Sequence, residues 1–468
     1  MERTRDQDRS AFSAFADSFG GRLVLPGDPD YHRARVVWNA IFDRYPACIA
    51  QCGSAADVVA AIRFARERQL RVAVRGGGHS AAGFSTCDDG MVLDLRPIQG
   101  VFVVPDRKVA WVGGGAHLSQ LDEATQEAGL ACPVGVIGHT GVGGLTLGGG
   151  MGRLQRKHGL TIDNLIGVDM VTADGQVIQA DQHENSELFW GVRGAGANFG
   201  VITSFRFRLH PVGPAIVQGV VIHPIERAHE LAEVFRHTVA VAPDELMMSL
   251  EFRVATEYPP FEPGMAGHPV VLIEVTYCGA VEEADRHIRA IRSGAGKPVV
   301  DTVQPRSFLA VQTRKDETLA WGHRFYMKNA FFPAVTDQVV DLCASRVSDA
   351  PGKCSVSFMA QGGEIARVPD DAMAFPGRRA PLWCGVETVW DEPSMDDAHI
   401  GWGRATMAAL KPFAGDGHYV NDVVEAGDDV VRSIYGDAKY RRLVALKQAW
   451  DPDNVFKLNQ NIVPRPAS

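Results

Sequence analysis

The sequence predicts a two-domain protein of the α+β class, and three observations support this prediction. The chain has 468 residues, which is more than one hydrophobic core usually organises. Helix and strand patterns are interleaved along the chain, and no internal repeat is present. Several glycine runs lie before the proline-marked segment 210–214, and such runs stop from there to about residue 417. This change in composition predicts that a second domain begins after that segment.

The first domain is predicted to begin with a helix followed by a buried strand. Ser54 to Asp57 has the form of a capping box, and apolar residues follow at positions 58, 61, 62 and 65 with helical spacing. The charged stretch 66–69 ends this helix, and a short apolar strand is predicted over 71–75. The pattern then predicts strands over 91–95, 101–104 and 108–112, a helix over 118–128, a hairpin around Asp174-Gly175 and a strand over 201–210.

The middle of the chain mixes strands with amphipathic helices. Strands are predicted over 216–222 and 270–277, and a helix is predicted over 225–241. Near the C-terminus, residues 437–450 have a helical pattern and residues 451–454 form a predicted turn.

Composition and charge exclude several classes of function. The formal net charge is −9 and the pI is about 5.9, which disfavours a nucleic acid or an anionic membrane as a partner. No stretch approaches the ~20 apolar residues of a membrane span, and the first ten residues have no apolar signal core, so a cytoplasmic protein is expected. The eight cysteines include no Cys-x-x-Cys pair, and most of them are interpreted as structural thiols. No group of residues has metal-ligand spacing, so no metal is predicted.

Glycine runs are the most informative feature of the first domain. They lie at 76–78, within VRGGGHSAAG, at 113–115, and within the segments 135–152 and 191–200. Backbone N–H groups in such loops form concavities that suit a pyrophosphate. Neither GxGxxG nor GxxxxGK[ST] occurs, so a Rossmann or P-loop nucleotide site is not supported.

Five segments resemble a known family. They are WNAIFDRYPACIAQC, RGGGHSAAG, GLTLGGGMGRLQRKHGLTIDNL, FWGVRGAGANFGVITSF and DPDNVFKLNQNI. Together they are similar to the FAD-linked oxidases of the vanillyl-alcohol oxidase/p-cresol methylhydroxylase (PCMH) fold, in the berberine-bridge-enzyme-like branch. The resemblance covers residues 25–212 and 419–463. It implies a PCMH-type FAD-binding domain formed by 1–212 and 418–468, with a substrate domain inserted at 213–417.

The resemblance also implies which residues hold FAD. His79 would bond covalently to the 8α-methyl carbon of the flavin, because the family's histidine at this position does so. The other implied residues are Arg75, Gly76, Gly77, Gly78, Ser80 and Gly83 in the pyrophosphate loop; Thr140, Gly141, Gly144 and Gly150 at the pyrophosphate and ring; Gly200 and Val201 at the adenosine; and Asn459 and Asn461 at the flavin edge.

Some family members carry a second flavin bond, to a cysteine. The position that matches it here, four residues before Gly141, is Ile137. Cys132 lies five residues earlier in the chain, a span of up to roughly 17 Å if extended. A single linkage through His79 is therefore predicted, and Cys132 is interpreted as a structural thiol. The neighbouring His117, His139 and His158 are expected to have hydrogen-bonded structural roles.

The predicted catalytic residues come from the substrate domain and the segment that follows it. Tyr419 matches the family's Tyr-x-Asn segment and is the candidate base, provided that a cation such as Lys328 lowers its pKa. Tyr326 and Lys328 share one face of a strand that resembles the family's R-x-Y-x-K strand, opposite Phe325 and Met327. Gln361 is a further candidate on a strand pattern. For Lys328 and Gln361 a role as polar groups of the sheet surface stays equally open, and for Glu387 that plainer role is favoured.

The predicted function is an FAD-dependent oxidase of a small molecule. A protein base would take a proton from a hydroxyl or amine, hydride would pass from the adjacent carbon to flavin N5, and dioxygen would reoxidise the flavin. The aromatic-rich segment 324–332 favours an aromatic or polycyclic alcohol or amine over a carbohydrate. The alternatives are a dehydrogenase with another acceptor, a carbohydrate oxidase, and a protein that binds flavin or ligand without turnover.

Overall fold

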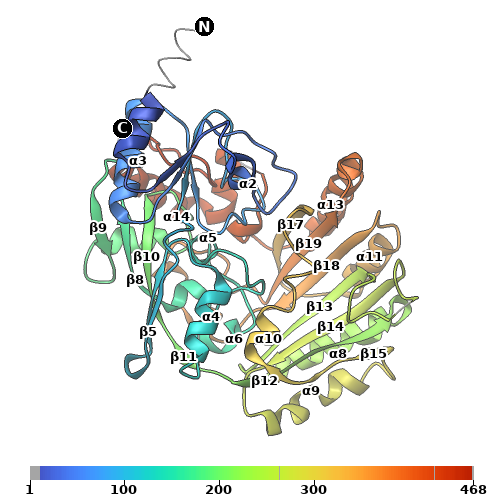
Figure 1. Cartoon of the computed structure of the whole chain (residues 1–468). Coiled ribbons are helices and arrows are strands. Elements are labelled where there is room, and N and C mark those ends of the chain that lie inside the picture. The colour runs from blue at the N-terminus through green and yellow to red at the C-terminus, as the bar shows by residue number, and fades with distance from the viewer. Residues whose placement is uncertain (1–10, 263, 426, 466–468) are drawn as a thin grey trace.

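The computed structural model describes residues 11–262, 264–425 and 427–465, and these form two parts that meet along a broad interface (Figure 1). One part contains a four-stranded and a five-stranded sheet, and the other contains an eight-stranded sheet. Within the described residues, no helix is both long and apolar enough to cross a membrane. The α+β class and the two-domain arrangement predicted from the sequence are confirmed.

The four-stranded sheet carries the first glycine loop. Its strand order is β1-β2-β4-β3, and β2, β4 and β3 are parallel. Ser54 caps helix α3 by accepting a hydrogen bond from the backbone N–H of Asp57, as the capping pattern predicted. The apolar side of α3 packs on this sheet, so the chain returns through β3 directly into the glycine loop. The elements are β1 (Arg22–Val24), α2 (Tyr31–Arg35), β2 (Cys48–Gln51), α3 (Ala55–Glu67), β3 (Val72–Arg75) and β4 (Met91–Asp94).

The five-stranded sheet is antiparallel, with the order β5-β6-β10-β8-β9. Its strands are β5 (Val101–Val104), β6 (Val109–Gly113), β8 (Leu165–Val171), β9 (Val177–Ala180) and β10 (Val201–Arg208). The elements around it are α4 (Leu118–Gln126), β7 (Leu130–Ala131), α5 (Val142–Leu147), α6 (Gln155–His158), α7 (Ser186–Val192) and β11 (His210–Pro211).

The C-terminal segment returns to this first part. Helix α14 (Asp428–Trp450) lies among the blue and green elements in Figure 1. It packs so closely on α7 that a Cβ added to Gly191 would lie 2.2 Å from Leu446 Cδ2. The predicted helix 437–450 is its second half, because Gly436, with φ 69°, kinks the helix just before it.

The eight-stranded antiparallel sheet has helices on one face. Its order is β15-β12-β14-β13-β18-β19-β17, and β16 pairs with β12. The strands are β12 (Ala215–Pro224), β13 (Leu246–Val254), β14 (Pro269–Tyr277), β15 (Val300–Asp301), β16 (Gln304–Ser307), β17 (Arg324–Phe332), β18 (Lys353–Ala360) and β19 (Leu382–Trp390). The helices are α8 (Ala228–Val241), α9 (Ala284–Ser293), α10 (Phe308–Gln312), α11 (Asp337–Ser348), α12 (Glu364–Arg367) and α13 (Asp396–Leu410). Helices α8, α9, α11 and α13 bury one sheet face, which leaves the other face for the glycine-rich part.

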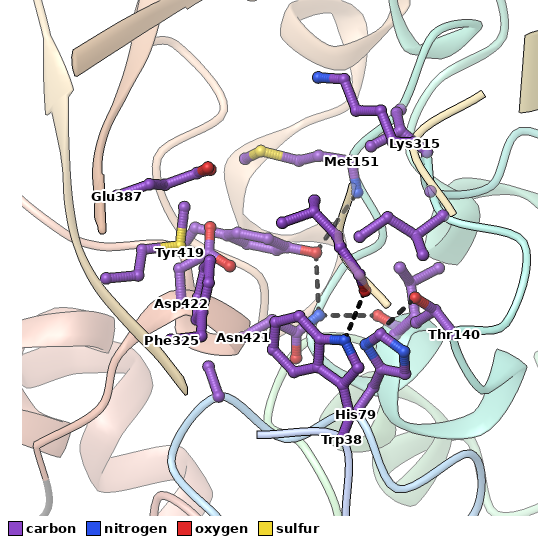
Figure 2. Close-up of a pocket in the computed structure, with 18 of the residues that line it drawn as sticks. Trp38, His79, Thr140, Met151, Lys315, Phe325, Glu387, Tyr419, Asn421 and Asp422 are labelled. Carbon is purple, nitrogen blue, oxygen red and sulfur yellow. Dashed lines mark hydrogen bonds between the residues drawn. The ribbon is translucent and has the colours of Figure 1, made fainter. Parts of the chain in front are cut away.

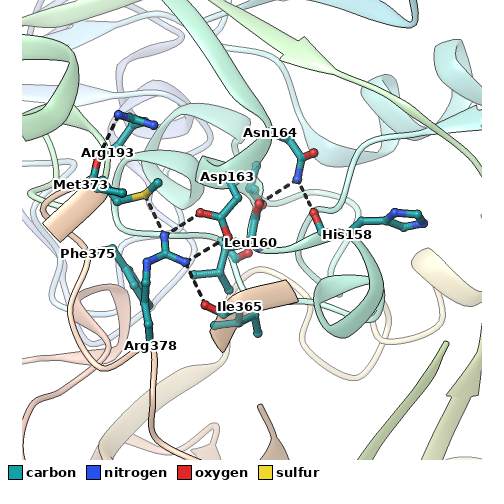
Figure 3. A network of polar contacts seen from close by, with 12 residues as sticks. His158, Leu160, Asp163, Asn164, Arg193, Ile365, Met373, Phe375 and Arg378 are labelled. Carbon is teal, nitrogen blue, oxygen red and sulfur yellow. Dashed lines mark hydrogen bonds and ion pairs between the residues drawn. The ribbon is translucent and has the colours of Figure 1, made fainter. Parts of the chain in front are cut away.

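A buried ion pair joins the two parts (Figure 3). Arg378 Nη2 lies 2.6 Å from Asp163 Oδ1, and the Arg378 side chain is fully buried. Asp163 belongs to the first part, where its other carboxylate oxygen accepts the backbone N–H of Leu160 at 2.8 Å. Since a buried charge needs a partner, this contact fixes the loop that carries Arg378 against the glycine-rich part.

Candidate active site

A cavity of about 560 Å³ lies between the open face of the eight-stranded sheet and the glycine-rich part. The first part lines it with Trp38, with β3 and the loop that follows it, with residues within 135–153 and with residues 195–197. The returning C-terminal segment adds residues 419–423 and 456–460. Strands β13, β14, β17, β18 and β19 supply the opposite wall. The glycine runs and the substrate-domain sheet therefore face one common space.

Two of the glycine loops touch through bare backbone. A Cβ added to Gly77 would lie 2.3 Å from the backbone nitrogen of Gly141, and one added to Gly141 would lie 2.2 Å from that of Gly77. Real Cβ atoms do not approach other atoms so closely, so only glycine fits at either position. This contact brings His79 from the first loop beside Thr140 from the second (Figure 2).

His79 is held on two sides. Its ring stacks on the indole of Trp38, with centroids 4.5 Å apart and an interplanar angle of 18°. His79 Nε2 lies 2.6 Å from His139 Nδ1, and His79 Nδ1 lies 3.5 Å from Thr140 Oγ1. Burial lowers the pKa of His79 to about 2, so the ring is neutral at physiological pH and one nitrogen keeps its lone pair.

Two observations indicate that the cavity can hold FAD. A Cβ added to Gly144 or to Gly196, which both line the cavity, would meet nothing within 4 Å, so both glycines border open space. Several buried polar atoms on the lining have no hydrogen-bond partner among the described residues, and Ser85 Oγ, Asn459 Oδ1 and Gln460 Oε1 are among them. Such atoms are rare in folded proteins unless a ligand or water satisfies them.

Nine of the residues predicted to hold FAD line the cavity: Gly76, Gly77, Gly78, His79, Ser80, Thr140, Gly141, Gly144 and Asn459. The other six, which are Arg75, Gly83, Gly150, Gly200, Val201 and Asn461, lie outside the cavity lining.

Three of these six have visible structural roles. Arg75 is fully buried and donates to the carbonyl oxygens of Ser85 and Arg35 at 3.1 and 3.2 Å. Gly83 has φ +70° and lies against Phe42, and a Cβ on Gly200 would collide with the carbonyl of Val171. These residues therefore shape the loops that surround the cavity.

Tyr419 lies in the cavity and is bound through its hydroxyl oxygen. That oxygen accepts a hydrogen bond from the backbone N–H of Gly150 at 3.0 Å. It also accepts from the backbone N–H of Met151 at 3.3 Å and from Asn421 Nδ2 at 2.8 Å (Figure 2). Burial raises the pKa of Tyr419, and the nearby Asp422 adds to this effect. The phenol is therefore protonated at neutral pH.

The expectation that Lys328 lowers the pKa of Tyr419 is wrong. Lys328 Nζ pairs with Glu425 at 2.5 Å, and the hydroxyl of Tyr326 donates to the same carboxylate at 3.1 Å. Neither side chain lines the cavity, and Gln361 does not line it either. The alternation along β17 is as predicted, but the cavity lies on the other face, so Phe325 and Met327 form its wall.

Two carboxyl groups were missed or undervalued by sequence reasoning. Glu387, for which sheet-surface polarity was favoured, lines the cavity on β19, and Asp422 lines it three residues after Tyr419. Within the described residues, neither carboxyl has a hydrogen-bond or ion-pair partner. Burial raises the pKa of Glu387, while the cations Lys315 and Arg253 oppose this effect. Burial raises the pKa of Asp422 well above its usual range, and the charge of Glu387 raises it further.

The remaining predictions concern cysteine, metal and histidine. Cys132 is fully buried and lies outside the cavity lining, whereas Ile137 lines the cavity. In the described part of the chain, no group of three or more His, Cys, Asp or Glu residues is placed to hold a metal ion. His158 and His210 stack on each other away from the cavity, with centroids 4.2 Å apart.

Comparisons with known proteins agree with this geometry. Residues 46–181 match the family model of the FAD binding domain, and residues 411–463 match that of berberine and berberine-like proteins. An FAD-linked oxidoreductase of Dictyostelium discoideum is 31% identical over 462 residues, which cover 96% of each chain. The (R)-6-hydroxynicotine oxidase of Paenarthrobacter nicotinovorans is 30% identical over 466 residues, covering 96% of this chain and 97% of the relative. A solved structure of 6-hydroxy-D-nicotine oxidase from Arthrobacter nicotinovorans superposes with a TM-score of 0.86 at 26% identity, covering 96% of this chain and 98% of that one.

Proposed function

Because the chain belongs to the berberine-bridge-enzyme-like family of FAD-linked oxidoreductases, we propose that it is an oxidase of a small alcohol or amine. One observation carries the proposal: a single cavity joins the His79 loop to the unpartnered carboxyl of Glu387 and the hydroxyl of Tyr419. When bound, FAD supplies the two-electron acceptor and takes a hydride from the substrate carbon at flavin N5.

Glu387 is the best candidate for the catalytic base. Two carboxyls in one cavity divide acid and base roles when their surroundings separate their pKa values. Asp422 keeps its proton because burial and, in addition, the charge of Glu387 oppose its ionisation, whereas Lys315 and Arg253 favour the charged form of Glu387. Glu387 would therefore take the proton from the substrate hydroxyl or amine, and Asp422 would donate a hydrogen bond.

Tyr419 would orient the substrate. Three N–H donors face its oxygen and occupy its acceptor positions, so its own proton is left to be donated into the cavity. No acceptor for that proton is present among the described residues. Tyr419 would then donate a hydrogen bond to the reacting hydroxyl or amine, and Glu387 would accept the proton of the same group.

The wall of the cavity supports the predicted aromatic or polycyclic substrate. Phe325, Met327, Met359 and Trp383 line it, and aromatic and thioether side chains pack well on flat rings. Trp383 also has an indole N–H without a partner among the described residues. A carbohydrate is the second candidate, because Glu387 and Asp422 could bind its hydroxyl groups.

Covalent attachment of FAD through His79 alone belongs to this proposal, as do dioxygen as the acceptor and a location in the cytoplasm. The neutral ring of His79 supports the first part, because only an imidazole with a free lone pair is a nucleophile. The fully buried thiol of Cys132 does not reach the cavity lining.

Anaerobic bleaching of the purified yellow protein tests the proposal. Panels of aromatic alcohols, cyclic amines and oligosaccharides are mixed with the protein, and the visible absorbance of the oxidised flavin is recorded. We expect an aromatic alcohol or amine to bleach the flavin and air to restore it. Bleaching without recovery in air would identify a dehydrogenase, and a panel that bleaches nothing would favour binding without turnover.

A further inference from the structure

A chain of three groups leads from His79 out of the cavity. His79 Nε2 lies 2.6 Å from His139 Nδ1, and His139 Nε2 lies 3.3 Å from the backbone carbonyl oxygen of Asp316. His79 lines the cavity, whereas His139 and Asp316 do not. His139 is half-buried, so it has access to solvent as well as to His79.

The carbonyl at the end of this chain determines where each proton lies. A backbone carbonyl only accepts hydrogen bonds, so His139 Nε2 must carry a hydrogen. In a neutral ring the other nitrogen, His139 Nδ1, is then an acceptor, and His79 Nε2 must donate to it. His79 Nδ1 therefore holds the lone pair, and Thr140 Oγ1 lies 3.5 Å from this nitrogen.

We propose that His139 is a positioning residue and proton acceptor for flavin attachment, and that it directs the bond to Nδ1 of His79. The proposal rests on the covalent attachment proposed above. The ring of His79 cannot turn freely, because Trp38 stacks on one face of it and the hydrogen bond to His139 fixes its edge. His139 thus selects both the tautomer and the nitrogen that reacts.

A bond forms between His79 Nδ1 and the 8α-carbon, and one hydrogen leaves each partner as a proton. The proton of His79 Nε2 passes to His139 Nδ1 and from there to solvent. The electron pair released by this oxidation goes to dioxygen, which takes up two protons to form hydrogen peroxide. While His139 holds this proton, the hydrogen bond runs in the reverse direction, from His139 Nδ1 to His79 Nε2.

The substrate domain completes this arrangement. The carboxylate of Asp316 accepts the backbone N–H of Gly138 at 2.6 Å, beside His139, and the indole N–H of Trp38 donates to the carbonyl of Leu319 at 2.7 Å. Residues 316–319 therefore hold both the partner and the stacking ring of His79. Attachment depends on the two domains being docked, although the reacting nitrogen belongs to the first.

The test uses the full-length chain with two substitutions at one position. His139→Ala removes both the tautomer control and the proton acceptor. In His139→Gln, the amide oxygen can still accept from His79 and the amide nitrogen can still donate to Asp316, but the side chain cannot take a proton. His117→Gln is the matched control, because this neighbouring histidine forms no hydrogen bond with His79 among the described residues.

Two readouts that need no turnover are compared. The first is the rate of covalent attachment. FAD is added to protein from riboflavin-limited cells, and the fraction of FAD that stays with the acid-precipitated protein is followed over time. The second is the identity of the linked nitrogen, from NMR of the flavin peptide. We expect attachment ~100-fold slower in both His139 variants, the usual loss for a missing general base, with His117→Gln unchanged. Wild type and His139→Gln should link only through Nδ1, and His139→Ala should give a mixture.

The outcomes separate this proposal from the one beneath it. If wild-type protein releases all of its FAD to acid, covalent attachment itself is wrong. If wild type retains FAD but links through Nε2, or if both His139 variants attach it at the wild-type rate, the role of His139 is wrong. Reversible FAD binding and the melting temperature show whether a variant is folded. If neither His139 variant folds, the nitrogen that is linked in wild-type protein still tests the proposal.

Discussion

The ring of Phe375 packs edge-on against the ring of Tyr419, with centroids 6.2 Å apart. The guanidinium of Arg378 lies 5.3 Å from the centroid of the same Phe375 ring and pairs with Asp163 across the two domains (Figure 3). A Cβ added to Gly149 would lie 2.6 Å from Phe375 and 3.0 Å from Tyr419. The buried ion pair therefore supports the residue that faces the substrate, through one aromatic ring.

Replacing Arg378 should destabilise the protein strongly. Arg378→Met leaves the buried carboxylate of Asp163 without its cation, which typically costs about 3–5 kcal/mol. Urea denaturation measures the change in the free energy of unfolding. Arg379→Met is the control, since Arg379 is exposed, and it should stay within about 0.5 kcal/mol of wild type. Equal effects of the two substitutions would contradict the importance of the ion pair.

Glu387→Gln should slow flavin reduction at least ~100-fold while FAD stays bound, because the side chain can no longer accept a proton. Stopped-flow absorbance under anaerobic conditions measures this rate. Since burial raises the pKa of Glu387, the wild-type rate should fall as the pH drops through that raised value, at a pH above the usual 4.5. The variant should lack this limb of the pH profile; a variant with the wild-type rate and profile would remove Glu387 from the mechanism.

Tyr419→Phe should act mainly on stability and substrate binding. Three N–H groups, from Gly150, Met151 and Asn421, lose their acceptor, and a buried group left without a partner typically costs about 1–3 kcal/mol. We expect a lower melting temperature and a higher KM, with flavin reduction slowed less than in Glu387→Gln. The reverse order of the two reduction rates would restore Tyr419 as the base.

Gly77→Ala should abolish tight FAD binding. The added methyl would lie 2.3 Å from the backbone of Gly141, so the two loops would have to separate and the His79 loop would move. Gly100→Ala is the control, since a Cβ there meets nothing within 4 Å. The ratio of flavin to protein absorbance after purification checks the prediction, and a fully yellow Gly77→Ala protein would contradict it.

Acid denaturation should distinguish one flavin bond from two. Wild-type protein and Cys132→Ala should keep their yellow colour in the precipitate, whereas His79→Ala should release its FAD. Mass spectrometry of a digest then identifies the linked peptide. A flavin peptide that contains Cys132 would show that this buried thiol reaches the flavin after all.

Local features could be predicted from the sequence because local geometry alone decides them. The cap of α3 depends on Ser54 and on the N–H of Asp57, three residues away. The alternation along β17 follows from the pleat of a strand, whatever surrounds it. The five segments that resemble the FAD-linked oxidases, RGGGHSAAG among them, also sufficed to identify the family and its cofactor.

The partners of the reactive side chains were decided only by the tertiary structure. Lys328 meets Glu425 rather than Tyr419, because packing of the two domains turned the Phe325 face of β17 toward the cavity. His79 meets His139, which is 60 residues away and is held by a carbonyl of the other domain. The alternation of side chains along a strand shows which of them share a face. It does not show what that face contacts, because the contacts come from segments that are remote in the chain and close only after folding.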